Sequence, residues 1–455
     1  MWNDVYMFCT HYGEIMNKME WPLLISDMRL GQEDLGPSRK DERTEFKRDS
    51  DRLIFSAPFR RLQNKTQVFP LPGSVFVHNR LTHSLEVASV GRSLGDDVSH
   101  ALMDKHPELQ EAVIGELGAI VNAACLAHDM GNPPFGHSGE RAIASYFLEG
   151  EGQRYKNQLT YDQWADITHY DGNANAFRLL THQFKGRRAG GFVLTYSTLA
   201  SIVKYPFPAS EATKQKFGYF VQERYIFERI ATRLGLKKKG AGWCRHPLAY
   251  LVEAADDICY EIMDIEDSHK LKILSFDETR DLMLGFVPSD KREKIIERSK
   301  MVKDQNEDVV YFRSCAIGAL IDECVHVFVE NEDAILDGTF EGSLIDNACP
   351  LIRDAYDACV AVAYDKIYRS RLVIDTELAG YKIIYTLIDL FIEAVMNPTH
   401  AYSQLLLDRV SSQYEVDSED TYGRIMAVLD YVSGMTDVFA LDLYRKIKGE
   451  SLPMI

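Results

Sequence analysis

The hydrophobic and polar positions along this chain repeat mostly at the spacing of an α-helix. Residues 112–127 form one broad apolar helical face, and Gly131 and Pro133 follow as stop signals. Residues 247–268 repeat the pattern, with an apolar stripe that runs from Leu251 to Ile262. Few segments alternate as strands do. The pattern therefore predicts a fold of the all-α class, in which nearly all regular structure is helical.

Two of the predicted helices carry polar groups at defined places. His128 and Asp129 fall at the C-terminal end of the 112–127 helix. In the second helix, Asp256, Tyr260 and Asp264 are spaced i, i+4 and i+8, so they form one polar row. A third helix is expected to begin near His83, with Thr82 or Ser84 as its capping residue. The first two helices therefore hold most of the candidate chemistry.

The pattern divides the chain into four parts. Residues 1–18 show no clear periodicity and are expected to be a loosely packed extension, and residues 19–275 form the predicted catalytic core. Residues 276–400 contain several amphipathic helices without a chemically readable motif, and oligomerisation is their expected role. Residues 401–455 predict two more helices, joined near Gly434 and packed on the core.

Composition narrows the class of protein. The 455 residues are 46% hydrophobic, and 51 basic against 68 acidic residues give a net charge of −17. The negative electrostatic field of such a chain argues against nucleic-acid binding through overall charge. A phosphate ligand must therefore be bound by local basic groups. The 8 cysteines include no C-x-x-C pair, which favours reduced thiols in a cytoplasmic protein. Neither a signal peptide nor an apolar run of about 18 residues is found, so no membrane partner is expected.

Four residues can be read as one set of metal ligands. His83, His128, Asp129 and Asp256 would supply two imidazoles and two carboxylates to a divalent cation. Such a set leaves positions for water and a substrate oxygen, and it favours Mn, Fe, Co, Ni or Zn over Mg. We expect one divalent metal per subunit. The residues alone leave open a chance His-Asp pair and a solvated Asp256-Asp257 face.

The candidate ligands lie within longer motifs that follow one another in a recognisable order. The main ones are residues 60–68 (RRLQNKTQV), 80–88 (RLTHSLEVA), 128–140 (HDMGNPPFGHSGE) and 253–260 (EAADDICY). Further ones are residues 21–24 (WPLL), 51–56 (DRLIFS), 172–178 (GNANAFR), 199–206 (LASIVKYP) and 433–437 (SGMTD). Together they resemble the HD-domain deoxynucleoside triphosphate triphosphohydrolases, and most closely the bacterial dGTPase branch.

The resemblance implies a fold, a reaction and an assembly. The fold is an HD-type helical core with peripheral helices, in which His83, His128, Asp129 and Asp256 hold the metal. The reaction converts a deoxynucleoside triphosphate, with dGTP preferred, to deoxynucleoside and inorganic triphosphate by attack at the α-phosphorus. The assembly is a homo-oligomer, as a hexamer or tetramer.

His137 and Glu140 lie one helical turn apart, directly after the metal motif. By the same resemblance, they position or activate the attacking water. A carboxylate can raise the basicity of an imidazole that shares protons with a nucleophile. The alternative is structural, with Ser138 as a helix cap and His137 closing the loop.

Six further residues are expected to bind substrate. Guanidinium and ammonium groups suit the triphosphate, and an amide can read a base edge. The resemblance implies that a tyrosine ring and a carboxylate face the deoxyribose and exclude a 2′-hydroxyl. Arg80 and Lys204 are expected to bind the triphosphate, Gln67 the base, and Tyr260 and Asp264 the sugar. Tyr205 is the sixth expected substrate-binding residue.

Two other functions are compatible with the ligand set. An HD-domain phosphohydrolase acting on a cyclic or alarmone nucleotide would use the same ligands, and detection of triphosphate as product would distinguish it. A nucleotide-sensing or single-stranded-DNA-binding protein with secondary catalysis would use the basic loops at 185–188 and 237–239. The presence of His137 and Glu140 beside all four ligands favours catalysis.

Overall fold

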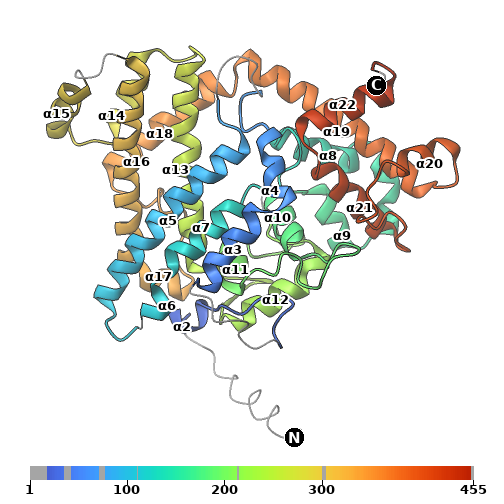
Figure 1. Cartoon of the computed structure of the whole chain (residues 1–455), viewed down its shortest axis with the longest axis horizontal. Helices are drawn as coiled ribbons and strands as arrows, with labels where there is room; N and C mark the ends of the chain where they lie inside the picture. The colour runs from blue at the N-terminus through green and yellow to red at the C-terminus, as the bar shows by residue number, and fades with distance from the viewer. Residues whose placement is uncertain are drawn as a thin grey trace, which may run out of the picture.

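The computed structural model describes residues 18–34, 43–70, 77–109, 111–212, 215–299 and 304–451, which are mostly helical (Figure 1). The predicted all-α class is confirmed. Within this part of the chain, the only paired strands are β1 (Lys238–Lys239) and β2 (Gly242–Trp243), an antiparallel hairpin where a loop was predicted. No described helix is long and apolar enough to cross a membrane. The predicted extension at residues 1–18 lies almost wholly outside the described residues.

The centre of the fold is a group of helices that pack through apolar faces. They are α3 (Glu45–Ile54), α5 (Arg80–Lys105), α7 (Leu117–Ala127), α11 (Tyr196–Ile202) and α13 (Pro247–Lys270). The helix predicted at 247–268 is confirmed as α13. The backbones of α5 and α7 approach closely, since a Cβ at Gly95 would lie 2.6 Å from the Cα of Gly118.

Two helix beginnings differ from the sequence prediction. The helix predicted at 112–127 is two helices, α6 (Glu111–Ile114) and α7, and the break contains Gly115, which weakens a helix. The helix that carries His83 is capped by Asn79, not by Thr82 or Ser84. The Asn79 side chain accepts from the Thr82 backbone N–H, and the Thr82 hydroxyl accepts from the Asn79 N–H at 3.1 Å. This capping box makes Thr82 the third helical residue.

A second group of helices lies beside this centre. It contains α8 (His137–Leu148), α9 (Tyr161–Thr168) and α10 (Gly172–Thr181), whereas α12 (Arg224–Arg233) packs on α11 of the centre. Shorter elements connect the segments: α2 (Trp21–Leu24), α4 (Ala57–Arg61), η1 (Leu62–Asn64), η2 (Glu151–Gln158), η3 (Ala209–Glu211) and η4 (Val221–Glu223). Since α8 begins at His137, the predicted catalytic histidine stands at a helix N-terminus.

The C-terminal half divides between the two sides of the molecule. On the side of α13 lie α14 (Phe276–Gly285), α15 (Ser289–Ser299), α16 (Gln305–Glu330), α17 (Glu332–Asp337), α18 (Pro350–Val362) and η5 (Ala363–Ile367). The long α19 (Arg371–Met396) packs on α8, with α20 (Ala401–Leu407), α21 (Thr421–Ser433) and α22 (Asp437–Lys448) against it (Figure 1). Two helices were predicted for residues 401–455, joined near Gly434; these are α21 and α22, and α20 is a third that the prediction missed.

Buried apolar side chains form two clusters, one on each side of a seam. The first includes residues of α5, α7, α11, α13 and α16, and the second includes residues of α8, α9, α19, α21 and α22. The candidate residues come from both sides, because α5 and α13 belong to the first cluster and α8 belongs to the second. The domain boundaries predicted after residues 275 and 400 stay predictions.

Candidate active site

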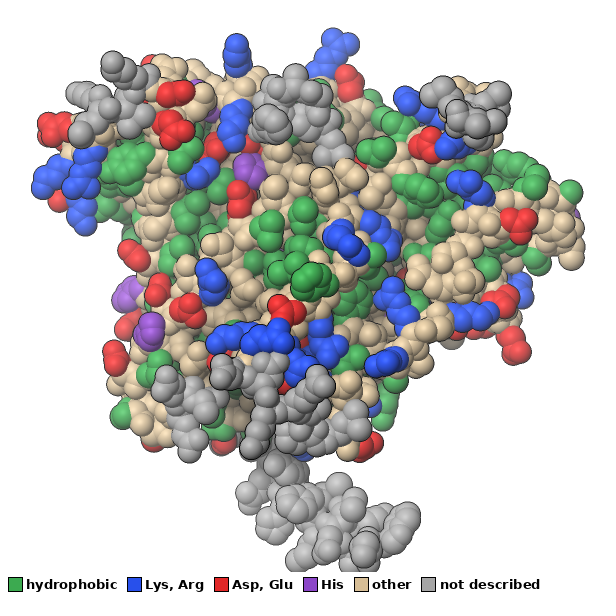
Figure 2. All heavy atoms as spheres, viewed as in Figure 1, with side chains coloured by type: hydrophobic (Ala, Val, Ile, Leu, Met, Phe, Trp, Pro, Cys, Tyr) green, Lys and Arg blue, Asp and Glu red, His purple; other side chains and the backbone are tan. Residues whose placement is uncertain are grey.

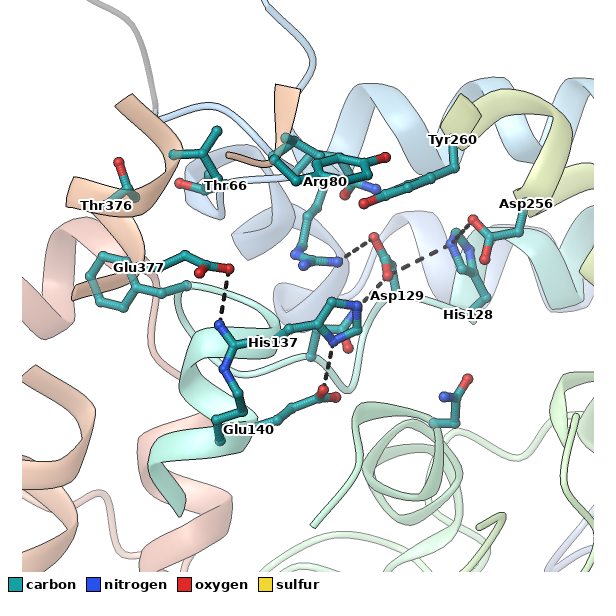
Figure 3. A pocket seen from close by; sticks show the side chains of 18 of the residues that line it. Thr66, Arg80, His128, Asp129, His137, Glu140, Asp256, Tyr260, Thr376 and Glu377 are labelled. Carbon is teal, nitrogen blue, oxygen red and sulfur yellow. Dashed lines mark hydrogen bonds and ion pairs between the residues drawn. The ribbon is translucent and has the colours of Figure 1, made fainter. Parts of the chain in front are cut away.

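A pocket of about 300 Å³ opens between the two hydrophobic clusters (Figure 3). In this view, His128 and Asp256 form its right end, and Thr376 and Glu377 of α19 form its left end. His137 lies between the two ends, at the start of α8. The pocket therefore joins the predicted metal site to a wall from the C-terminal half of the chain.

His83, His128 and Asp256 form a cluster that can hold a metal ion. They come from α5, the end of α7 and α13, and one ligand atom of each lies within 4.8 Å of the others. The Nε2 atom of His83 is 3.0 Å from Asp256 Oδ1, and Nε2 of His128 is 3.4 Å from the same oxygen. Folding thus brings together three of the four predicted ligands from positions far apart in the sequence.

The environment of His128 fits a metal ligand. Its Nδ1 lies 2.6 Å from the carbonyl oxygen of Cys125, which can only accept, so Nδ1 carries the donated proton. Its Nε2 is buried and makes no hydrogen bond. Burial alone would lower the pKa of His128, but the carboxylates of Asp129 and Asp256 outweigh burial and raise it to about 9. A fixed Nδ1–H and a negative field at Nε2 suit a bound cation.

Asp129 lies at the edge of this cluster and is held by two other groups. Its Oδ1 is 3.7 Å from His128 Nε2 and accepts a hydrogen bond from Asn132, while its Oδ2 accepts from Arg80 Nη1 at 2.8 Å. Burial would raise the pKa of Asp129, but Arg80, His128 and His83 together outweigh burial and hold it below its usual value. The carboxylate is therefore ionised, and its role as fourth ligand stays a prediction.

His137 and Glu140 form an ordered pair beside the cluster. The Nδ1 atom of His137 is 2.7 Å from Glu140 Oε2, and the other carboxylate oxygen accepts from the backbone N–H of Gly172 at 2.7 Å. Burial would raise the pKa of Glu140, but His137, Lys216 and the backbone N–H of Gly172 together outweigh burial and lower it. An ionised Glu140 favours a proton on Nδ1, so Nε2 of His137 can accept one.

The structure places some predicted substrate residues in the pocket and others outside it. Gln67, Arg80 and Tyr260 line the pocket, and Gln67 Oε1 is buried without a hydrogen-bond partner. Asp264 is buried behind the wall, where its Oδ2 accepts from the hydroxyl of Tyr368 at 2.8 Å. Asp264 therefore reaches the pocket through Tyr368, which does line it.

Lys204 and Tyr205 line a neighbouring pocket of about 370 Å³. Lys204 Nζ lies 3.0 Å from Oε1 of Glu253, which precedes Asp256 by one turn of α13. Burial would lower the pKa of Lys204, but the carboxylates of Glu253, Asp257 and Asp256 together outweigh burial and raise it. Glu253 and Asp256 share α13, so the ion pair of Lys204 lies one helical turn from the predicted metal site.

Sequence analysis missed several residues that line the pocket. Lys216 Nζ lies 2.7 Å from Asp171 Oδ2 and 3.9 Å from Glu140 Oε2. Burial would lower its pKa, but Glu140 and Asp171 outweigh burial and raise it, so Lys216 is charged. Arg141 and Glu377 form an ion pair of 2.9 Å at the wall. The other missed residues of the wall are Asn173, Tyr368, Val373 and Thr376.

The helical core and the His-His-Asp cluster define a phosphohydrolase of the HD class. Residues 80–186, which contain His83, His128 and Asp129, match the HD domain family. Residues 350–446, which supply Tyr368 and Glu377, match a phosphohydrolase-associated domain. The two matches thus meet at the pocket.

Relatives with similar sequences match this chain over nearly its whole length. A deoxyguanosinetriphosphate triphosphohydrolase-like protein of Pseudomonas aeruginosa is 36% identical over 96% of this chain and 100% of its own length. A protein of that name from Synechocystis is 36% identical over 95% of this chain and 100% of its own length. The deoxyguanosinetriphosphate triphosphohydrolase of Yersinia pestis is 30% identical over 88% of this chain and 93% of its own. The chain belongs to this triphosphohydrolase family, as its motifs predicted.

Proposed function

We propose that the protein hydrolyses deoxynucleoside triphosphates to deoxynucleoside and inorganic triphosphate, with dGTP as its preferred substrate. The observation that carries this proposal is one pocket in which His128 and Asp256, clustered with His83, lie beside the His137–Glu140 pair. Names of relatives with similar sequences support the same reaction. The charged groups of the pocket suit the triphosphate of a nucleotide, and its aromatic wall suits the nucleoside.

His83, His128 and Asp256 would hold the divalent ion, with Asp129 as the proposed fourth ligand. When bound, such an ion supplies Lewis-acid polarisation of a phosphoryl oxygen. The mixed nitrogen and oxygen donors suit Mn, Fe, Co, Ni or Zn, and Mg is the less favoured choice. Metal analysis of the purified protein and reconstitution with each ion test this assignment.

The His137–Glu140 pair is proposed to activate water. In the overall reaction, the water oxygen bonds to the α-phosphorus, the bond from that phosphorus to the 5′-oxygen breaks, and triphosphate keeps all three phosphorus atoms. Nε2 of His137 takes a proton from the water, which balances the proton that the 5′-oxygen needs. Glu140 stabilises the imidazolium because it accepts from Nδ1 at 2.7 Å.

Replacement of His137 tests this role directly. We expect His137→Ala to lower kcat by about 10²- to 10⁴-fold, the usual contribution of general acid–base catalysis, and to leave metal content unchanged. His400→Ala, which removes an exposed histidine outside the pocket, is the matched control. Loss of bound metal from His137→Ala would instead identify His137 as a ligand or structural residue.

Arg80 and Lys216 are proposed to bind the triphosphate inside the pocket. Both are charged, and a guanidinium with an ammonium suits clustered anionic oxygens. Lys204 and Tyr205 would meet the far end of the triphosphate from the neighbouring pocket, which the ion pair of Lys204 with Glu253, one turn before Asp256 on α13, supports. Lys204→Ala should then raise KM for a deoxynucleoside triphosphate, and an unchanged KM would remove Lys204 from the site.

Tyr260 and Tyr368 are proposed to face the deoxyribose. Their rings lie 6.2 Å apart and both line the pocket, and Asp264 fixes the Tyr368 hydroxyl from behind. Two rings against one face of the sugar leave little room for a 2′-hydroxyl. Tyr368→Ala should therefore narrow the preference for dGTP over GTP, which competition assays measure.

The preference for dGTP is proposed to depend on Gln67 and Glu377. Guanine presents two adjacent N–H donors on its Watson–Crick edge, and a carboxylate offers two acceptors that match them. Since Glu377→Gln keeps only one acceptor, we expect the ratio of kcat/KM for dGTP over dATP to fall about tenfold. Glu393→Gln, on the same helix but paired with Arg154 outside the pocket, is the control. An unchanged ratio would contradict the role of Glu377.

Product analysis tests the whole proposal. Purified protein is incubated with each of the four deoxynucleoside triphosphates, singly and in pairs, with Mn or Mg, and deoxynucleoside and triphosphate are quantified. Equal amounts of both products are expected. Absence of turnover under every condition would defeat the proposal, and turnover of a cyclic or alarmone nucleotide alone would favour the rival HD phosphohydrolase.

Single-stranded DNA is a second proposed ligand, as for a nucleotide-sensing protein. The exposed residues Lys47, Arg60, Lys185 and Arg188 support it, and Figure 2 shows Lys and Arg side chains gathered on the face where α3 lies. This local concentration of positive charge contrasts with the net charge of −17. Salt-dependent gel shifts test it, and Lys185→Ala with Arg188→Ala should weaken binding.

Assembly and location complete the proposal. Exposed apolar side chains on α19, such as Leu378 with 66% of its surface exposed, support a homo-oligomer. A hexamer or tetramer is proposed, and light scattering on the purified protein distinguishes the two. The predicted cytoplasmic location stays a prediction.

A further inference from the structure

The motif at residues 433–437, between α21 and α22, contacts the two segments that build the pocket. The carboxylate of Asp437 is buried and accepts two backbone hydrogen bonds. Its Oδ2 accepts from the N–H of Thr66 at 2.7 Å, and its Oδ1 accepts from the N–H of Phe135 at 2.9 Å. Thr66 precedes Gln67, and Phe135 lies two residues before His137. One side chain thus joins the segment that contains Gln67 to the loop at residues 132–137, which precedes α8 and is called the catalytic loop below.

Further hydrogen bonds from the same motif reinforce this junction. Arg61 Nη1 donates to the carbonyl of Gly434 at 2.6 Å. Lys65 Nζ donates to the carbonyl of Ser433 at 2.8 Å and to the carbonyl of Asn132, in the catalytic loop, at 2.5 Å. The carbonyls of Ser433 and Gly434 therefore bind the 61–65 segment, and Lys65 joins that segment to Asn132 in the loop before His137.

The catalytic loop needs such support because its backbone is strained. Phe135 has φ 62° and Gly136 has φ 55°. A positive φ costs conformational energy in Phe135, because a residue with a side chain rarely adopts it. Such a conformation persists only where the surroundings hold it. Gly380 of α19 packs against Phe135 from another direction, since a Cβ there would lie 2.5 Å from the Phe135 Cβ. The C-terminal helices thus hold the turn that orients His137.

We propose that Asp437 is a positioning residue for catalysis, which holds the 66–67 segment and the 135–137 turn in their working arrangement. The inference rests on the proposed role of His137 and goes beyond it, because it assigns a task to the phosphohydrolase-associated region at 350–446. That region supplies both the Asp437 carboxylate and the Gly380 surface.

Variants of Asp437 test the proposal, and a variant of Thr436, which caps the same helix, serves as the control. Asp437→Ala should lower kcat for the preferred deoxynucleoside triphosphate by about 100-fold, and Asp437→Asn, which keeps one acceptor, by about tenfold. KM should change much less, and metal content should match the wild type. Thr436→Ala is the matched control, since it removes the cap that accepts from Phe439 N at 3.1 Å without touching either segment. We expect it to keep the wild-type kcat while lowering the melting temperature.

A second variant moves the same turn with Asp437 intact. Gly380→Ala should displace Phe135 and lower kcat with metal content unchanged, and an unaltered kcat would overturn the proposal. Equal kcat values for Asp437→Ala and Thr436→Ala, or loss of metal from Asp437→Ala, would overturn it too. His137→Ala is measured beside them. If His137→Ala is inactive while the Asp437 variants match the wild type, only this inference fails; if His137→Ala stays active, the proposed role of His137 fails.

Discussion

His78 shows how one residue can make folding depend on pH. Its Nδ1 lies 2.8 Å from Asp267 Oδ2, and its Nε2 lies 3.0 Å from Glu86 Oε1. Burial alone would lower the pKa of His78, but the two carboxylates outweigh burial and raise it to about 10. A histidine in the unfolded chain has a pKa near ~6.5, so the folded state holds the proton more tightly. The resulting stabilisation is complete below that pH and is lost as the pH rises towards 10.

The variant His78→Gln isolates this contribution. Between about pH 6 and about pH 10, the melting temperature of the wild type should fall more steeply than that of His78→Gln, because only the wild type loses this proton linkage. His400→Gln, at an exposed position, should follow the wild type. Calorimetry across this range measures the difference. Parallel curves for wild type and His78→Gln would show that the two carboxylates do not retain the proton.

Single residues also show how far the sequence could predict the site. His128 and His137 were predictable because they belong to one continuous motif, with Glu140 within one helical turn. Lys216 and Glu377 were not predictable, because each reaches the pocket from a distant segment and a lone Lys or Glu is normally a surface residue. Lys204 was predictable as a basic group, but only the folded chain shows its ion pair with Glu253.

At the scale of elements, the contact between α5 and α7 depends on the absence of side chains. A Cβ at Gly95 would lie 2.6 Å from the Cα of Gly118, and backbone cannot move aside cheaply. We expect Gly95→Ala to destabilise the fold by about 1–3 kcal/mol through overpacking. Gly318→Ala, within α16 where a Cβ meets nothing within 4 Å, should instead stabilise it by up to about 1 kcal/mol. Urea denaturation of both variants measures the two signs. Destabilisation of equal size in both would disprove the packing argument.

The elements that sequence could predict are those with a long apolar period. The helix at Pro247–Lys270 was predictable because its stripe continues over six turns or so without a breaker. The cap of α5 was misplaced because Asn79, Thr82 and Ser84 can all act as caps, and only the backbone geometry selects Asn79. The break between α6 and α7 follows from one glycine whose effect the strong flanking pattern concealed.

At the scale of the whole molecule, the active site occupies the seam between two hydrophobic clusters. The proposed metal ligands belong to helices of the first cluster, while His137 begins a helix of the second. The 350–446 region lines the pocket from the second side through Glu377, while Asp437 holds the backbone of Phe135, another lining residue. Catalysis therefore requires that both clusters be formed and correctly joined. This explains why the pocket could not be predicted from the HD motifs alone.

Metal binding should consequently stabilise the whole molecule, because it joins α5, α7 and α13 through one cluster. A ligand that binds only the folded state at about 100 times its Kd stabilises it by roughly 2.7 kcal/mol. After chelation, we expect added Mn to raise the melting temperature of the wild type and of His137→Ala alike. Asp256→Ala should show no such shift, since it removes the carboxylate that lies 3.0 Å from His83 and 3.4 Å from His128. An equal shift in Asp256→Ala would place the metal elsewhere, while a shift lost only in His137→Ala would exchange the roles proposed for the two residues.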